Sequence, residues 1–210
     1  MSTIAIIDYG SGNLRSAAKA FEKVAGAKHE VKVTSNINDL ILASHIVLPG
    51  VGAFGDCMAG LKAIPGMIDT MQDQVFIQQK PFMGICVGMQ LLAQEGKEHG
   101  IHQGLGWIKG SVISIPVAQQ HIKVPHMGWN ELSLNLPPHP IVNGISSGDH
   151  AYFVHSYYMD VHESGVVVAT TTHGRELTAI VAKDNIVATQ FHPEKSQETG
   201  QVIIANFLNM

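Results

Sequence analysis

Short apolar runs alternate with helical periods through the first half of this 210-residue chain. Four runs rich in β-branched and aliphatic residues predict buried strands: residues 3–8, 31–35, 45–50 and 82–87. From Asn13 the pattern changes to helical, with apolar residues at helical spacing from Leu14 to Ala25, and further helical stretches separate the later runs. Strands that alternate with helices predict βαβ units, in which helices cover both faces of a parallel sheet.

The second half of the chain has a different pattern. Strand-like runs follow one another with short turns at residues 107–115, 152–159, 166–172, 177–183 and 185–191. We expect these runs to be antiparallel additions, followed by a closing helix with one apolar face. The sequence therefore predicts a single α/β domain over residues 1–210, with an open, mostly parallel sheet flanked by helices.

Composition limits the function classes. Charged residues make up 14% of the chain and the formal net charge is −4, without a basic run, so we expect neither nucleic acid nor membrane as a partner. The N-terminus has no basic region before its apolar run, and no apolar run reaches transmembrane length. We expect a cytoplasmic protein in which the two cysteines, Cys57 and Cys86, are free thiols. His99 and His102 lack the surrounding ligand pattern of a metal site, so we expect no metal and no cofactor.

Cys86 lies between Gly84 and Gly88, where an apolar strand passes directly into a helix in the segment GICVGMQLL. Small residues at these two positions allow a sharp strand-to-helix turn that projects the middle side chain. This is the layout of a nucleophile elbow, with sulfur in place of oxygen. The alternative is a buried structural cysteine.

A base for this cysteine is available in ATQFHPEKS, residues 188–196. In an extended chain, His192 and Glu194 project to the same side, so Glu194 orients the imidazole while its other nitrogen faces Cys86. An imidazolium partner favours the reactive thiolate, and the same histidine later protonates the leaving group. The alternative, a structurally satisfied histidine, accounts less well for the combination of His192, Pro193 and Glu194.

An oxyanion hole requires two backbone N–H donors. One is expected at Val87, the residue after the nucleophile. For the other, the segment LPGVGAFGD (48–56) follows a strand, and Gly50 and Gly52 permit close approach of the backbone to a ligand. We expect Val51 and Gly52 to line the site; the alternative is an ordinary turn between a strand and a helix.

Together, GICVGMQ, FHPE (191–194) and PGVG (49–52) resemble the class I (triad) glutamine amidotransferases. The blocks IIDYGSGNLRS (6–16), VPHMGWN (124–130), YFVHSYY (152–158) and QFHPEKSQ (190–197) narrow the resemblance to the glutaminase-subunit family of imidazole glycerol phosphate synthases. The resemblance extends from residue 6 to residue 197 and implies a flavodoxin-like fold.

The resemblance implies that L-glutamine is hydrolysed to glutamate and ammonia. Ammonia would pass to a separate (βα)8-barrel cyclase subunit in a heterodimer that serves histidine biosynthesis. Cys86 would be the nucleophile, His192 the acid and base, and Glu194 the residue that orients it. A chain consumed by one α/β domain also leaves no part to bind an ammonia acceptor, which independently indicates a partner.

The resemblance also implies a glutamine site and a partner surface. Gln90 and an acidic residue further along the same helix would hold glutamine; this residue is Glu98, with Glu95 as the alternative. The backbone near His155, Ser156 and Tyr157 would close the pocket. Four residues match partner-facing or gating positions in the family: Asn13, Trp129, Tyr152 and Lys195. For Trp129 and Tyr152, simple core packing is the alternative.

Three other functions remain open at this point. The chain could serve a different ammonia-channelling synthase, such as one that makes pyridoxal phosphate, although the DYGSGN and PHMGWN blocks disfavour this. Cys86 could be a redox sensor that is oxidised rather than acylated. A non-catalytic binding subunit is the third alternative, and an intact triad argues against it.

Overall fold

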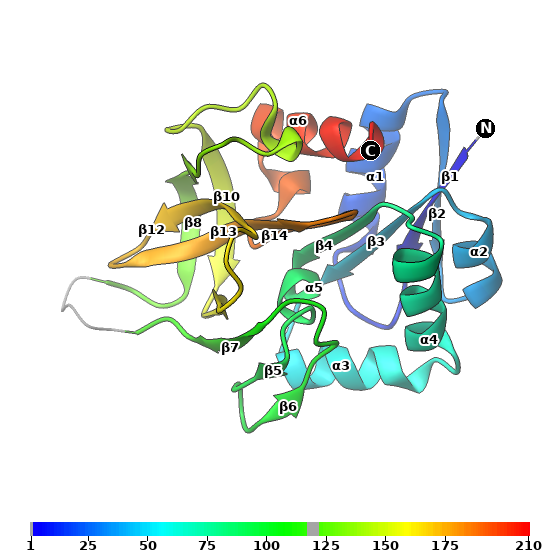
Figure 1. Ribbon diagram of the computed structural model, residues 1–210, viewed down its shortest axis with the longest axis horizontal. Coiled ribbons are helices and arrows are strands. Elements are labelled where there is room, and N and C mark those ends of the chain that lie inside the picture. The colour runs from blue at the N-terminus through cyan, green and yellow to red at the C-terminus, as the bar shows by residue number, and fades with distance from the viewer. Residues whose placement is uncertain (1, 117–121) are drawn as a thin grey trace.

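The computed structural model describes residues 2–116 and 122–210. Its large sheet has the strand order β2-β1-β3-β4-β14-β13-β12-β9 (Figure 1). These strands are β1 (Ser2–Ile7), β2 (His29–Thr34), β3 (His45–Gly50), β4 (Phe82–Cys86), β9 (Ser133–Leu134), β12 (Val167–Thr172), β13 (Glu176–Lys183) and β14 (Ile186–Thr189). Strands β2, β1, β3, β4 and β14 are parallel, and β13, β12 and β9 continue the sheet antiparallel. The parallel part has the flavodoxin-like order.

Helices cover both faces of this sheet (Figure 1). On one face, α1 (Leu14–Ala25) packs against α6 (Gln197–Leu208), and Phe21 meets Phe207 edge to face with ring centroids 6.2 Å apart. The opposite layer contains α2 (Ile37–Leu42), α3 (Phe54–Ala63) and α4 (Met67–Gln72), which continues into the π-helical turn η1 (Asp73–Ile77). The fold class predicted from the alternating pattern is confirmed. Within the described residues, no helix combines the length and apolar character needed to cross a membrane.

Two smaller sheets extend the molecule beyond the large one. Strand β8 (His126–Glu131) pairs with β10 (His150–His155), and β11 (Tyr157–Val161) lies in another sheet with β7 (Gly110–Ser114), β5 (Glu95–Gly96) and β6 (His102–Gln103). The prediction of one strand over 152–159 was therefore wrong. The chain leaves one sheet and enters another at Ser156, although the run of strand-forming residues continues through this point.

Two other sequence predictions also require correction. Strand β14 pairs in parallel with β4, so it is the last strand of the parallel core and not an antiparallel addition. The helix after Cys86, α5 (Val87–Gln90), is a single turn. The apolar run continues through Leu91, Leu92 and Ala93, but all three are fully buried, and an apolar run of this kind does not distinguish a helix from other buried structure.

The carboxyl ends of the parallel strands meet at one edge of the large sheet, where open α/β sheets bind their ligands. Gly50 at the end of β3 lies opposite Cys86 at the end of β4. The chain after β14 reaches His192 within three residues, and its 3₁₀ turn η3 (Pro193–Lys195) leads into α6. This parallel topology therefore brings the 49–52 segment, Cys86 and His192 to one place. The remaining regular element, η2 (Pro140–Val142), is a 3₁₀ turn.

Candidate active site

Cys86 is the last residue of β4 and has a backbone conformation that is rare for an L-residue, with φ 55° and ψ −111°. The neighbouring glycines are sterically required. A Cβ at Gly84 would lie 2.8 Å from the Gly88 carbonyl oxygen, and a Cβ at Gly88 would lie 1.8 Å from the Leu48 carbonyl oxygen. The expected elbow is therefore present in its backbone geometry. Both Cys86 and Cys57 are buried free thiols.

His192 and Glu194 meet at the cavity through a hydrogen bond of 2.7 Å between His192 Nδ1 and Glu194 Oε1. The backbone reaches this arrangement in a way the sequence did not predict. Residues 193–195 form a 3₁₀ turn and not an extended segment, with the Lys195 N–H donating to the His192 carbonyl at 3.0 Å. Pro193 suits the first position of such a turn because its φ is already fixed and it has no N–H to satisfy.

Neighbouring side chains hold this pair in place. Asn13, in a left-handed conformation before α1, donates its side-chain amide to the same Glu194 oxygen. The backbone of His192 is held by β10, because its N–H donates to the Tyr152 carbonyl. The Ser196 hydroxyl closes the arrangement by accepting from the Tyr152 N–H and donating to the His192 carbonyl. Asn13 thus helps to fix the position of the Glu194 carboxylate beside His192.

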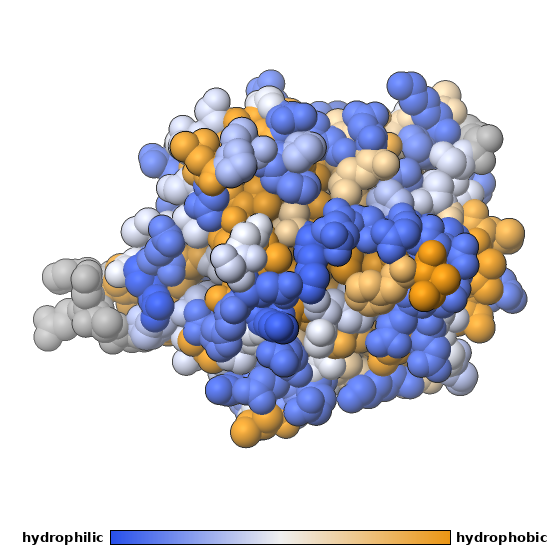
Figure 2. Space-filling model, in the orientation of Figure 1, coloured by the Kyte–Doolittle hydropathy of each residue, from blue (hydrophilic) through white to orange (hydrophobic). Residues whose placement is uncertain are grey.

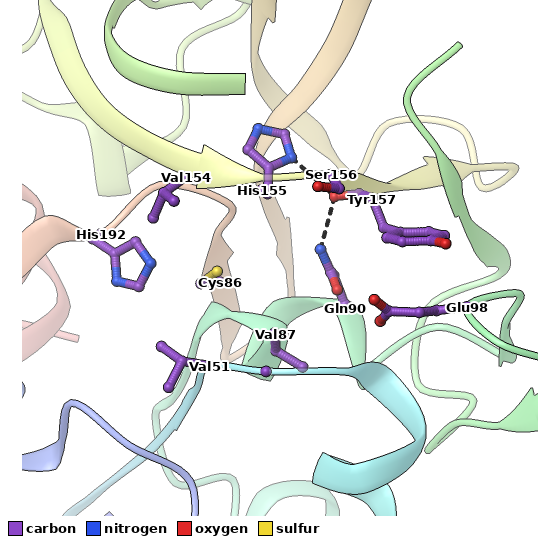
Figure 3. A pocket seen from close by; sticks show the side chains of 11 residues that line it. Val51, Cys86, Val87, Gln90, Glu98, Val154, His155, Ser156, Tyr157 and His192 are labelled. Atoms are coloured by element: carbon purple, nitrogen blue, oxygen red, sulfur yellow. Dashed lines mark hydrogen bonds between the residues drawn. The ribbon is translucent and has the colours of Figure 1, made fainter. Parts of the chain in front are cut away.

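The electrostatic setting of His192 favours its charged form. Burial lowers the pKa of His192, but the neighbouring Cys86 sulfur and Glu194 carboxylate outweigh burial and raise the pKa to about 9. His192 Nε2 has no hydrogen-bond partner among the described residues, and the ring lies beside Cys86 in Figure 3. The arrangement therefore favours an imidazolium next to the sulfur.

These side chains border a cavity of about 270 Å³ (Figure 3). Its volume suits a ligand the size of an amino acid. Its lining consists of Val51, Gly52, Cys86, Val87, Gln90, Glu98, Val154, His155, Ser156, Tyr157 and His192. Most residues proposed from the sequence for the oxyanion hole and the glutamine site are therefore brought together. Gly50 lies just outside the lining.

The acidic residue of the pocket is Glu98, and it is not on the helix that carries Gln90. Because α5 ends at Gln90, Glu98 reaches the cavity from the loop between β5 and β6, and one carboxylate oxygen accepts from the Phe54 N–H at 2.8 Å. Glu95 lies on β5 and pairs with Lys97 at 3.3 Å, outside the cavity lining. The expectation of a shared helix was therefore wrong.

The backbone donors of the expected oxyanion hole are only partly in position. The Val51 N–H donates to Ser11 Oγ at 2.8 Å, and Ser11 Oγ in turn donates to the Val51 carbonyl at 3.3 Å. Val51 therefore borders the cavity without offering its N–H to a ligand in this conformation. Val87 is the first residue of α5, whose four residues provide only a small helix dipole.

Two buried residues near the site were not predicted from the sequence. Gln190 donates its amide to Cys86 Sγ at 3.8 Å and accepts from Gln90. His126 on β8 is hydrogen-bonded to His155 at 2.9 Å. Gln190 could have been found, since it lies two residues before His192. His126 could not, because its role depends on the long-range pairing of β8 with β10.

Comparison with known proteins adds independent findings. The family model "Glutamine amidotransferase class-I" matches residues 5–210. The imidazole glycerol phosphate synthase subunit HisH of Rhodospirillum rubrum is 50% identical over 208 residues, which cover 98% of this chain and 97% of that protein. The subunit of the same name from Bradyrhizobium diazoefficiens is 51% identical over 212 residues, covering 98% of each chain.

Solved structures with lower identity share the fold. A crystal structure described as a glutamine amidotransferase matches with a TM-score of 0.74 at 20% identity, covering 98% of this chain and 97% of the other. A glutamine amidotransferase from Thermotoga maritima matches with a TM-score of 0.67 at 15% identity, covering 99% and 83%.

The chain therefore belongs to the class I glutamine amidotransferases, and the enzyme class predicted from its motifs is confirmed. Within this class it belongs to the family of imidazole glycerol phosphate synthase subunit HisH. The predicted function, the glutaminase subunit of that synthase, is confirmed at the level of the family.

Proposed function

We propose that Cys86, His192 and Glu194 hydrolyse L-glutamine and that the ammonia passes to a (βα)8-barrel cyclase subunit. The observation that carries this proposal is the elbow cysteine beside a buried histidine whose Nδ1 lies 2.7 Å from Glu194 Oε1. The three residue types and their order of contact match the roles of nucleophile, base and orienting carboxylate.

Glutamine fits the cavity with its carboxamide at Cys86 and its amino-acid end toward Gln90 and Glu98. The Glu98 carboxylate supplies negative charge for the α-ammonium group, and its position is fixed by the Phe54 N–H. The segment from His155 to Tyr157 borders the cavity on another side, with the Tyr157 carbonyl held by Gln90 Nε2 at 2.9 Å. These groups give the pocket its selectivity for a free amino acid.

The reaction then follows from the positions of these groups. The Cys86 thiolate attacks the amide carbon, and the carbonyl oxygen takes up the negative charge. The tetrahedral intermediate collapses as His192 Nε2 gives its proton to the departing nitrogen, which releases ammonia and leaves a thioester. A water that loses a proton to His192 attacks this thioester, and glutamate leaves as the cysteine is regenerated. Glu194 holds the ring in one orientation throughout.

The oxyanion hole provides a gate for this chemistry. Stabilising the oxyanion with the Val51 N–H requires rotation of the peptide between Gly50 and Val51 and loss of the bond to Ser11. Gly50 has no side chain to oppose this rotation. We infer that the loaded partner favours the rotated state, so that the isolated chain has weak activity.

A surface next to the triad fits the partner. Met127 and Trp129 alternate on β8 with 63% and 47% exposure. Trp129 lies opposite Tyr152 in the strand pairing, their rings 5.9 Å apart, and Lys195 Nζ lies 5.7 Å from the Tyr152 ring. An exposed aromatic cluster with a nearby cation is typical of the centre of a protein interface. A cytoplasmic location for the complex remains a prediction from the sequence.

Glutamate release by the full chain tests the proposal, first alone and then with a barrel cyclase subunit and its nucleotide ligand. We expect strong stimulation by the loaded partner and loss of activity in Cys86→Ala. Equal activity with and without the partner contradicts the gate and the partner assignment. Absence of glutamate release in both cases contradicts the glutaminase mechanism and favours a redox role for Cys86.

A further inference from the structure

We propose that Gln190 is a further catalytic residue: its side-chain amide donates a hydrogen bond to the Cys86 sulfur and stabilises the thiolate. This inference rests on the proposed function, because it concerns the same nucleophile. Gln190 Nε2 lies 3.8 Å from Cys86 Sγ, and Gln190 is fully buried. Water therefore does not compete for the Gln190 amide, and the bond strengthens when the sulfur is charged.

The orientation of the Gln190 amide follows from its neighbours. Gln90 Nε2 lies 2.9 Å from the Tyr157 carbonyl oxygen, which can only accept, so the Gln90 atom there must be the nitrogen. The same nitrogen lies 3.0 Å from the Gln190 side chain, which must therefore present its oxygen. The Gln190 nitrogen is left facing Cys86. A backbone carbonyl thus fixes both amides, and the sulfur is contacted by a donor.

This donor complements the other groups around the sulfur. His192 takes the thiol proton on Nε2 and offers its positive charge, while Gln190 transfers no proton and remains neutral throughout. A buried thiolate without a hydrogen-bond donor would be costly to form. Gln190 acts on the nucleophile itself, before glutamine binds and independently of the oxyanion hole.

The direct test is alkylation of Cys86 by iodoacetamide as a function of pH, without glutamine, in the full-length chain. Peptide mass analysis separates labelling of Cys86 from labelling of Cys57. Gln190→Met keeps the length of the side chain and removes the donor. We expect its half-maximal alkylation to shift upward by about one pH unit, with about tenfold slower labelling below that pH. Gln190→Glu, which places a carboxylate beside the sulfur, should shift it further.

Two other variants make the result specific. Gln74→Met replaces another buried glutamine, on η1 and outside the site, and should leave the alkylation profile unchanged. Gln90→Met frees the Gln190 amide from its orienting bond and should produce a smaller upward shift than Gln190→Met.

A wild-type alkylation profile in folded Gln190→Met, checked by its urea midpoint, overturns the proposal. If Gln190→Met does not fold, a wild-type profile in both Gln190→Glu and Gln90→Met overturns it equally. The glutamate-release assay of the unmodified chain is separate. If the unmodified chain releases no glutamate, the proposed function is contradicted, whereas the alkylation profiles still report whether Gln190 acts on the sulfur.

Discussion

Ser11 makes two hydrogen bonds to the backbone of one residue, accepting from the Val51 N–H and donating to the Val51 carbonyl. Ser11→Ala removes both bonds and leaves the N–H without its partner, at a cost of about 1–2 kcal/mol to the turned-away peptide. The rotated peptide should gain population accordingly. We expect glutamate release by the isolated chain to rise up to about tenfold, measured at saturating glutamine.

Ser16→Ala is the matched control, because Ser16 is exposed on α1. It should leave the rate unchanged. Unchanged or reduced activity in Ser11→Ala would show that this hydroxyl does not hold the gate closed.

The pKa of His192 gives a residue-level prediction of pH dependence. Because this pKa is raised from about 6.5 to about 9 in the folded chain, the native state holds a proton that the unfolded state releases. The stabilisation is complete below pH 6.5 and is lost as pH rises through 9. Urea unfolding of the wild type should therefore weaken between these pH values more than that of His192→Gln. Parallel curves for the two proteins would contradict the raised pKa.

At the scale of elements, a chain of hydrogen bonds connects β8 to the cavity wall through the pairing of His126 with His155. His155 Nδ1 must donate to the Tyr157 carbonyl, so its Nε2 accepts from His126 Nδ1, whose own Nε2 accepts from Asn130. His126→Phe breaks two of these bonds but retains the stacking on Phe153. We expect a severalfold rise in the KM for glutamine with a smaller change in kcat.

His150→Phe, at an exposed position of the partner strand β10, is the control and should leave KM unchanged. An unchanged KM in His126→Phe would show that these hydrogen bonds do not contribute to glutamine binding.

Acid should lower the stability of the fold through the histidines on strands β8 and β10. Burial, with the neighbouring histidines His155 and His173, lowers the pKa of His126 to about 3. Burial is also the main reason that the pKa of His155 is lowered to about 4. The unfolded chain gains these protons below pH 6.5 and the native state does not, so stability falls from pH 6.5 toward pH 4. Urea midpoints should fall less steeply over this range in His126→Phe than in the wild type.

The elements also show what the sequence can and cannot predict. Strand β3 has the bounds of the predicted run 45–50. Its position could be predicted because it is determined by the local sequence, a short apolar run that ends at a glycine-rich turn. The pairing direction of β14 and the break at Ser156 were missed. Local periodicity predicts neither feature, because the pairing direction and the change of sheet depend on which strands, distant in the sequence, pair with these residues. Likewise, Cys86, His192 and Glu194 lie in short motifs, whereas His126 acquires its role only through strand pairing.

At the scale of the molecule, β8 and β10 carry Trp129 and Tyr152, and β8 and α2 lie toward opposite ends of the view in Figure 1. Trp129→Ala removes a half-exposed aromatic ring from the proposed interface. We expect about 30-fold weaker binding to the cyclase subunit by calorimetry, as for a central interface residue.

Leu42→Ala is the control: Leu42 is 79% exposed on α2, where Figure 2 shows apolar side chains at the right edge. Its affinity for the cyclase should equal that of the wild type. Equal losses in Leu42→Ala and Trp129→Ala would point to a general effect of surface hydrophobicity.

Because the chain changes sheets at Ser156, the cavity is bordered by residues of the large sheet and of both smaller sheets. A bound glutamine would therefore contact all three sheets, and separating any two of them would require the release of glutamine. In Cys86→Ala, which cannot turn glutamine over, amide hydrogen exchange in β10 and β11 should slow together when glutamine is added. The substrate would then also help to hold the two smaller sheets against the large one.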